Sequence, residues 1–157
     1  MKRQMCRLRD ARLTMGAPPA RRADLASGSM TEARQRLGRT AEALVANSLE
    51  RRGARILARN VRTSEVRGEI DLIALDGRAL VFVEVKALRA GSIGGPERPV
   101  LAVGPRKQRK LRSLAVAWLR DQDGSVPPHT SLRFDVVGVR LDALDRVVDW
   151  EHLRGAF

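Results

Sequence analysis

Two short runs of alternating apolar and polar residues, separated by Asp76-Gly77, constrain the fold of this chain more than any other feature. They lie within residues 68–86, GEIDLIALDGRALVFVEVK, and their period of two is typical of β-strands. Asp-Gly between two such runs is a strong signal for a tight turn. The segment therefore predicts an antiparallel strand pair.

Each predicted strand has one apolar face and one mixed face. The apolar faces carry Ile70, Leu72 and Ala74 on the first strand and Val81, Val83 and Val85 on the second. Four charged residues share the mixed faces at the open end of the hairpin, away from the turn: Glu69, Asp71, Glu84 and Lys86.

The register of the hairpin decides how Asp71 and Glu84 lie relative to each other. A two-residue turn at Asp76-Gly77 pairs residue 75 with 78 and places the two acids diagonally. A four-residue turn pairs 75 with 80 and places them directly opposite. Both registers put the two carboxylates on one face within side-chain reach, whereas a turn with an odd number of residues would separate them.

Two facing carboxylates repel each other unless a cation lies between them. Mg²⁺ is commonly held by one or two carboxylates together with waters and substrate phosphates. Lys86 could then orient or polarise a water, and a lysine is informative here because only 4 of the 30 basic residues are Lys. The pattern indicates metal-assisted hydrolysis of a phosphodiester. The alternative is a solvated face on which Lys86 only neutralises Glu69 or Glu84.

The composition favours a polyanionic partner. The net charge is +12, so we expect nucleic acid first, DNA in particular, and no membrane partner. Tyr is absent and Phe and Trp are few, which favours contacts to the nucleic-acid backbone over base stacking. One cysteine, Cys6, and the lack of a secretory signal or long apolar run suit a protein of the reducing cytoplasm. His129 and His152 are isolated and make no zinc set, we expect no small-molecule cofactor, and a homodimer is compatible with the sequence.

The rest of the chain predicts an α/β fold with a mixed sheet flanked by helices, in the order α-β-β-β-α-β. Residues 1–30 read as a disordered basic extension, an electrostatic arm or the product of a start codon placed too early, with Met15 or Met30 as alternative starts. Residues 31–157 form the domain. The pattern predicts these segments: a helix from Thr31, as N-cap, to Arg52; a strand over 54–61; a loop over 62–68; a Gly-rich connection over 87–104; a helix from Pro105; and a strand over 132–141 that a crossover reaches. Residues 142–157 have no firm assignment.

The predicted second helix begins with a cluster of positive charge. Its members are Arg106, Lys107, Arg109, Lys110 and Arg112, with no acid among them. Positive charge at a helix N-terminus opposes the helix dipole, unless an anion such as a phosphate binds there. We expect these residues to hold a nucleic-acid backbone, with Lys107 reaching inward. The alternative is an Arg-rich solvated face.

An Asp on one strand followed by Glu-x-Lys on the next resembles the PD-(D/E)xK nuclease superfamily. Asp71 and Glu84-Val85-Lys86 carry this resemblance, and Ile70 replaces the proline of the motif. Three segments together, AEALVANSLERRGARILARNVR, GEIDLIALDGRALVFVEVKALR and RFDVVGV, resemble the YraN-type bacterial proteins, which are related to archaeal Holliday-junction resolvases. The resemblance covers residues 34–157.

The resemblance implies a restriction-endonuclease-like fold and a divalent-metal site that uses Mg²⁺ or Mn²⁺. Asp71, Glu84 and the backbone carbonyl of Val85 would be the metal ligands, and Lys86 would assist the attacking water. Glu42 matches the acid on the first helix that often completes such sites, and it lies on the flank of the apolar stripe of its helix; an ordinary surface acid is the alternative.

Two further acids have other expected roles, and the function has alternatives. We expect Glu69 to be a partner of Lys86 and Asp135 to be structural. The resemblance implies a nuclease acting on DNA, selective for branched or damaged structures. A non-catalytic nucleic-acid-binding or assembly module with the same fold is the alternative, and an RNA-directed role is a third. Asp71, Glu84 and Lys86 favour the enzyme, because a protein that only binds phosphates gains little from carboxylates on its contact face.

Overall fold

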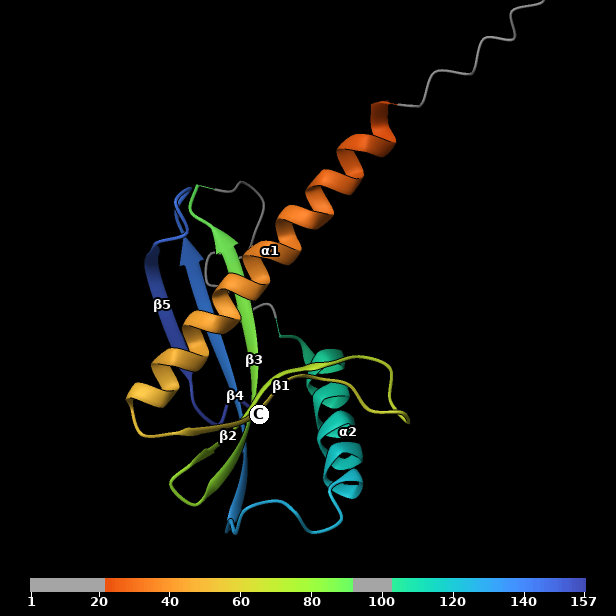
Figure 1. The fold of residues 1–157 in the computed structure, drawn as a ribbon, viewed down its shortest axis with the longest axis vertical. Coiled ribbons are helices and arrows are strands. Elements are labelled where there is room, and N and C mark those ends of the chain that lie inside the picture. Colours follow the sequence, from red (N-terminus) through yellow and green to blue (C-terminus); the bar gives the residue numbers. More distant parts are fainter. Residues whose placement is uncertain (1–21, 92–102) are drawn as a thin grey trace, which may run out of the picture.

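The computed structural model describes residues 22–91 and 103–157, which form a mixed sheet with one helix on each face (Figure 1). The elements in chain order are α1 (Arg22–Arg51), β1 (Arg55–Val61), β2 (Ile70–Asp76), β3 (Ala79–Arg89), α2 (Pro105–Asp121), β4 (Ser131–Leu141) and β5 (Val147–Leu153). The predicted α/β class is confirmed, and so is the order of elements as far as β4.

The five strands lie in the sheet in their sequence order, from β1 to β5. Neighbours are antiparallel except β3 and β4, which are parallel over their whole length. A parallel pair needs a crossover connection, and α2 lies in this connection, as the sequence predicted.

Each face of the sheet packs against one helix. On one face Ala41 and Val45 of α1 contact the row of valines on β3 and residues such as Leu72 and Val137. On the other face Leu111, Leu114 and Trp118 of α2 pack against Phe82 and Val136. Burying each aliphatic side chain of this kind contributes about 1.5–3 kcal/mol, so both helices are fixed to the sheet by apolar contacts.

Ile70 is an exception to the predicted alternation. It was expected on the face of Leu72, but it is buried with Ile73 in the α2-side core. The register of β1 against β2 shifts between Ile56 and Ala58, and Asn60, next to the Ile70 partner Val61, has a φ of 51°. Ile70 and Leu72 are therefore buried in the cores on opposite faces of the sheet.

The hairpin has the register of the longer predicted turn. Leu75 pairs with Leu80 and Leu72 with Val83, and this register places Asp71 opposite Glu84. Asp76 also pairs with Ala79, so the loop residues are Gly77 and Arg78 rather than Asp76 and Gly77. Gly77 has a φ of 61°, a conformation that glycine adopts without steric cost.

The first helix differs from its prediction. It begins at Arg22, so Thr31 lies inside the helix and is not its N-cap, and residues 22–30 of the expected disordered extension belong to the helix. A growing helix adds residues cooperatively and can continue without a packed face. Residues 1–21 lie outside the described residues. The helix ends as predicted, before Gly53 with a φ of 91°.

The C-terminal end forms a strand that the sequence did not predict. β5 pairs with β4, so the order is α-β-β-β-α-β-β. Its residues Val147, Val148 and Asp149 are all exposed, and an edge strand of this kind lacks the alternation that identifies half-buried strands. Of the predicted Gly-rich connection, residues 87–89 belong to β3, and residues 92–102 lie outside the described part of the chain.

Gly68 precedes the acid-bearing end of β2 and has a φ of 133°. A Cβ at this position would lie 3.1 Å from Lys110 Cε and 3.4 Å from Leu114 Cδ1. We expect Gly68→Ala to lower the free energy of unfolding by about 2 kcal/mol, because backbone strain and the contact with α2 add. Denaturant titration should measure this loss.

Gly77→Ala is the matched control for Gly68→Ala. Gly77 also has a positive φ, but its Cβ would meet no atom within 4 Å, so only the backbone cost of about 1 kcal/mol applies. Equal losses in the two variants would show that the contact of Gly68 with α2 contributes nothing.

Candidate active site

Asp71 and Glu84 are buried acids on adjacent strands. The exposed fraction is 8% for Asp71 and 2% for Glu84. The Asp71 carboxylate also fixes the open end of the hairpin, because its Oδ2 accepts a hydrogen bond of 2.7 Å from the backbone N–H of Val85. Buried carboxylates are unfavourable unless they are paired or bind a cation, so this end of the hairpin is a candidate for a functional site.

Two lysines contact one oxygen of Glu84. Lys86 Nζ lies 2.5 Å and Lys107 Nζ 3.0 Å from Glu84 Oε1. The other oxygen, Oε2, is buried and has no hydrogen-bond partner within residues 22–91 and 103–157. A buried acceptor without a partner is costly, and this carboxylate therefore has one oxygen available for a further ligand.

The pKa of Asp71 is raised to about 7. Burial is the largest cause, and the nearby charge of Glu84 adds to it, while the hydrogen bond from Val85 acts in the opposite direction. The Asp71 and Glu84 carboxylates are therefore close enough to interact strongly. A cation between them would offset the repulsion and favour the ionised form of Asp71.

Glu42 of α1 lies at the edge of the same site. Burial raises its pKa, a side-chain hydrogen bond from Asn60 lowers it, and the charges of Glu69 and Glu84 raise it further. Glu42 is therefore near enough to Glu84 for the charge of Glu84 to affect its pKa, as the prediction that this helix acid lies near the site requires. Its predicted catalytic role stays a prediction.

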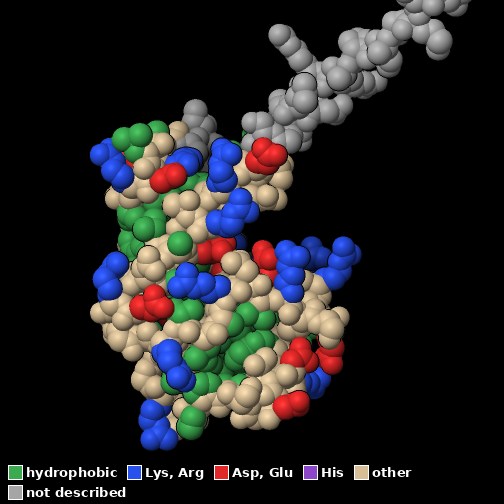
Figure 2. Space-filling model, viewed as in Figure 1, with side chains coloured by type: hydrophobic (Ala, Val, Ile, Leu, Met, Phe, Trp, Pro, Cys, Tyr) green, Lys and Arg blue, Asp and Glu red, His purple; other side chains and the backbone are tan. Residues whose placement is uncertain are grey.

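An open cleft lies beside this site and is lined by Glu42, Glu69 and Lys107. Figure 2 shows a notch in the surface with acidic side chains at its inner end and basic side chains on both sides. Two adjoining hollows, which share Arg62 and Glu69, make up the cleft. The first reaches α1 at Gln35, Arg39 and Glu42, and the second reaches α2 at Lys107. The cleft therefore lies between the two helices.

The basic residues of α2 have different surroundings. Arg106, Arg109 and Lys110 are exposed, as a surface that binds a polyanion requires. Lys107 reaches inward as predicted, although its contact is Glu84. The Arg112 guanidinium lies over the Phe157 ring at 5.2 Å, so this side chain also has a packing role.

The structure corrects the expected role of Glu69. This acid pairs with Arg62, whose Nη2 lies 3.1 Å from Glu69 Oε2, and Lys86 pairs with Glu84 instead. Arg62 follows β1 and reaches Glu69 at the start of β2, across the loop that joins the two strands. Arg62 therefore pairs with Glu69 across this loop, whereas Lys86 pairs with Glu84 of its own strand, β3.

Asp135 is structural in its contacts, as expected. Its two oxygens accept hydrogen bonds from Arg133, from His152 Nε2 at 2.8 Å and from the backbone N–H of Gly155 at 2.9 Å. Arg133 also pairs with Asp76 at the hairpin turn. This polar cluster joins β2, β4, β5 and the C-terminal residues.

Sequence reasoning did not identify Asn60 and Arg62 as neighbours of the acids. The only signal was the position of Asn60, since Asn adopts a positive φ more readily than most residues. Both side chains line the α1 side of the cleft.

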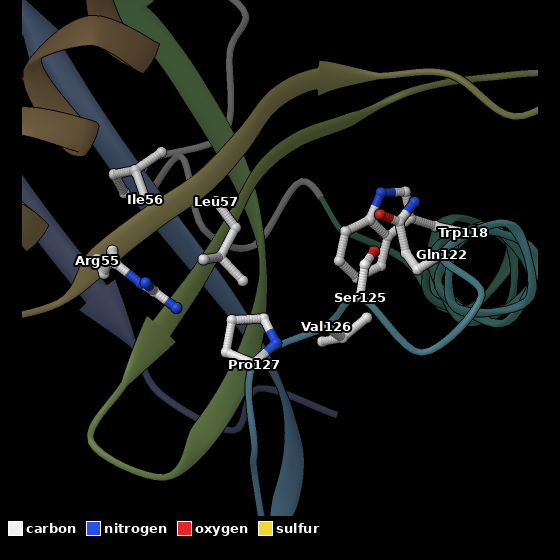
Figure 3. Close-up of a pocket in the computed structure, with 8 residues that line it drawn as sticks. All are labelled: Arg55, Ile56, Leu57, Trp118, Gln122, Ser125, Val126 and Pro127. Atoms are coloured by element: carbon white, nitrogen blue, oxygen red, sulfur yellow. The ribbon is translucent and has the colours of Figure 1, made fainter.

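A separate hollow, outside the cleft, lies between β1 and the end of α2. Figure 3 shows Leu57, Trp118 and Pro127 around it. Five of its eight lining residues are apolar and none is acidic. It contains no group of the candidate site, and its lining offers no catalytic chemistry.

The acid pair can be tested for its fit to a divalent cation. Within residues 22–91 and 103–157, no group of three or more His, Cys, Asp or Glu is placed to hold a metal ion alone. Asp71 and Glu84 nevertheless suit a hard cation such as Mg²⁺, because two carboxylates with waters and substrate phosphates commonly complete its shell. The Glu84 oxygen without a partner and the raised pKa of Asp71 both fit such an ion. The Val85 carbonyl stays a predicted third ligand.

This protein is an α/β protein with two buried acids and two lysines at one site, and comparison with known proteins gives its family. The model of the uncharacterised protein family UPF0102 matches residues 41–139, a range that includes the acids and both lysines of the site. The chain belongs to this family, which is the YraN-type family that its motifs resemble.

Curated relatives are similar over most of their length. A UPF0102 protein of Anaeromyxobacter dehalogenans is 45% identical over 132 residues, 83% of this chain and 90% of the relative. One of Streptomyces griseus is 46% identical over 123 residues, 78% of this chain and 97% of the relative. One of Moorella thermoacetica is 40% identical over 128 residues, 82% of this chain and 100% of the relative. These names state no activity.

No described helix is long and apolar enough to cross a membrane.

Proposed function

We propose that this protein is a divalent-metal-dependent nuclease that hydrolyses phosphodiester bonds in DNA. The observation that carries the proposal is the group of two buried acids, Asp71 and Glu84, with two lysines on Glu84, one of which, Lys107, lines an open cleft. One Glu84 oxygen has no hydrogen-bond partner among the residues that the structure describes. A protein of this kind would act in the cytoplasm, on DNA.

Asp71, Glu84 and the Val85 carbonyl would hold the metal ion, Mg²⁺ or Mn²⁺. When bound, the ion would supply charge stabilisation at the phosphate and lower the pKa of a water. Lys86, whose ammonium contacts Glu84 and whose side chain is 30% exposed, would position the attacking water. The reaction forms a bond between the water oxygen and phosphorus, breaks one bond between phosphorus and a sugar oxygen, and delivers a proton to that leaving oxygen.

The cleft supports a substrate larger than a single nucleotide. Arg39 and Arg62 line its α1 side, and Arg67 and Lys107 line the hollow that reaches α2. Cations on both sides of the acids can contact separate phosphates, an arrangement that suits duplex or branched DNA without base recognition.

A non-catalytic nucleic-acid-binding module is the second candidate. The observation that favours it is that two lysines already contact the Glu84 carboxylate, which is therefore neutralised without a metal ion. The two candidates differ in one result, the cleavage of DNA.

Cleavage assays should use single-stranded, duplex, flapped and four-way-junction DNA, with Mg²⁺ or Mn²⁺ and with EDTA. We expect metal-dependent cleavage that falls about a hundredfold in Lys86→Met, because the water loses its positioning group. Arg120→Met, which changes an exposed cation in the last turn of α2 that pairs with Glu65, should cleave at a rate within a few fold of the unchanged protein. Binding without cleavage in every condition would favour the module, and equal cleavage by Lys86→Met would indicate a contaminant.

A further inference from the structure

Lys107 belongs to the acid site although it lies on neither strand of the hairpin. It is in the first turn of α2, and its Nζ contacts the Glu84 oxygen that Lys86 also contacts. The Glu84 side chain is 2% exposed, whereas 36% of the Lys107 side chain is exposed. Lys107 therefore connects a buried carboxylate with the open cleft.

We propose that Lys107 is an exchangeable counter-ion of Glu84. It neutralises the carboxylate while no divalent cation is bound, and it moves to a phosphate of the nucleic acid when a cation binds Glu84. The inference rests on the proposed metal site and goes beyond it, because it makes Lys107 a positioning residue that couples cation binding to nucleic-acid binding.

Electrostatics gives the reason for the exchange. A divalent cation on Glu84 would lie within a few ångströms of both ammonium groups, and like charges at such distances repel by several kcal/mol in a partly buried site. Lys86 makes the shorter contact, on the same strand as Glu84, while Lys107 makes the longer contact from a separate helix and is the more exposed. Lys107 is therefore the ammonium that leaves.

The surroundings of Lys107 offer its ammonium a second position. The N-cap of α2 is Gly104, which has no side chain to cap the first turn of the helix, and this turn contains no acid. Arg106 beside it is exposed. A phosphate near this turn would meet the positive end of the helix dipole together with the released ammonium. Glu84 and the phosphate thus compete for the Lys107 ammonium.

Linkage makes the exchange measurable. If a bound cation frees Lys107 for the phosphate, nucleic acid must in turn strengthen cation binding by the same factor. A variant without the ammonium keeps the acids and Lys86 but loses this part of the coupling.

The test compares Lys107→Met with Arg120→Met, which removes an exposed cation in the last turn of the same helix, where it pairs with Glu65. Calorimetric titration with Mn²⁺ alone should show binding about fivefold tighter in Lys107→Met and unchanged within about twofold in Arg120→Met. Binding to a duplex oligonucleotide should be measured with and without Mn²⁺, with gels to show that the DNA is intact. Mn²⁺ should strengthen the binding of DNA about fivefold less in Lys107→Met than in the other two proteins.

The outcomes separate the inference from the proposed function. Mn²⁺ binding that is equal or weaker in Lys107→Met would overturn the inference and leave the metal site standing. Absence of Mn²⁺ binding by the unchanged protein would overturn the metal site, and the inference with it. Lys107→Gln and circular dichroism of each variant show whether a weakened response is a folding defect; a folded Lys107→Gln that binds Mn²⁺ no more tightly than the unchanged protein also overturns the exchange.

Discussion

Asp71→Asn is expected to abolish DNA cleavage and to stabilise the metal-free protein. Cleavage should fall by about a thousandfold or more, because loss of a metal ligand removes several kcal/mol of transition-state stabilisation. The pKa of Asp71 is raised to about 7 by burial and by Glu84, so its contribution to stability is complete below about pH 4 and is lost as the pH rises through 7. Asparagine carries no charge and avoids this loss. Above neutral pH, we expect a gain on the order of 2 kcal/mol in unfolding free energy.

Cleavage assays and denaturant titrations at acidic and alkaline pH check the two effects of Asp71→Asn. Glu69→Gln is the matched control, since Glu69 is an acid at the same end of β2 that pairs with surface Arg62. Its unfolding free energy should change by less than about 1 kcal/mol, with little loss of cleavage. A loss of stability in Asp71→Asn at every pH would show that burial and the charge of Glu84 do not destabilise the ionised Asp71 carboxylate.

Asp135→Ala should be the most destabilising single change in the sheet. The substitution leaves Arg133 and His152, both largely buried, without the carboxylate that they share. Breaking a buried ion pair by removing one partner costs about 3–5 kcal/mol. Asp149→Ala, an exposed aspartate on β5, should change the unfolding free energy by about 0.5 kcal/mol or less. Similar losses in the two variants would show that the polar cluster does not stabilise the sheet.

The same residue predicts an acid transition. Burial alone would raise the pKa of Asp135, but hydrogen bonds from His152, Arg133 and the Gly155 N–H outweigh it and lower the pKa to about 2. Asp135 therefore stabilises the fold above about pH 4, and this contribution, on the order of 2 kcal/mol, is lost as the pH falls through 2. Acid titration of the unfolding free energy should show this loss in the unchanged protein and a much smaller one in Asp135→Asn.

The hairpin shows how much of the site could be predicted from sequence. Alternation and the Asp-Gly turn gave the strands, their core faces and a register that brings Asp71 opposite Glu84. These are local properties of one segment. The face of Ile70 and the partner of Glu69 depend on the pairing of β2 with β1 and on the contact with Arg62. The sequence pattern within β2 does not predict these contacts.

The helices and the last strand show the same division. The inward face of α2 follows from its helical period, and Lys107 reaches inward as its sequence position suggested. The start of α1 could not be predicted, because its first turns extend beyond the sheet, where no core selects apolar positions (Figure 1). β5 could not be predicted either, since an exposed edge strand is defined by its hydrogen bonds to β4 and not by its own residues.

The parallel pairing of β3 with β4 has a consequence for the order of folding. Asp71 and Val85 are 14 residues apart, so the hairpin that carries the acids can form early from local contacts. β3 and β4 pair residues 52 positions apart, such as Ala79 with Ser131, and contacts of that separation form slowly. Lys107 belongs to the crossover between them and arrives with this late step. A nascent chain would thus form the hairpin with Asp71 and Glu84 before Lys107 reaches Glu84. The complete site would therefore be present only in a chain that has finished folding.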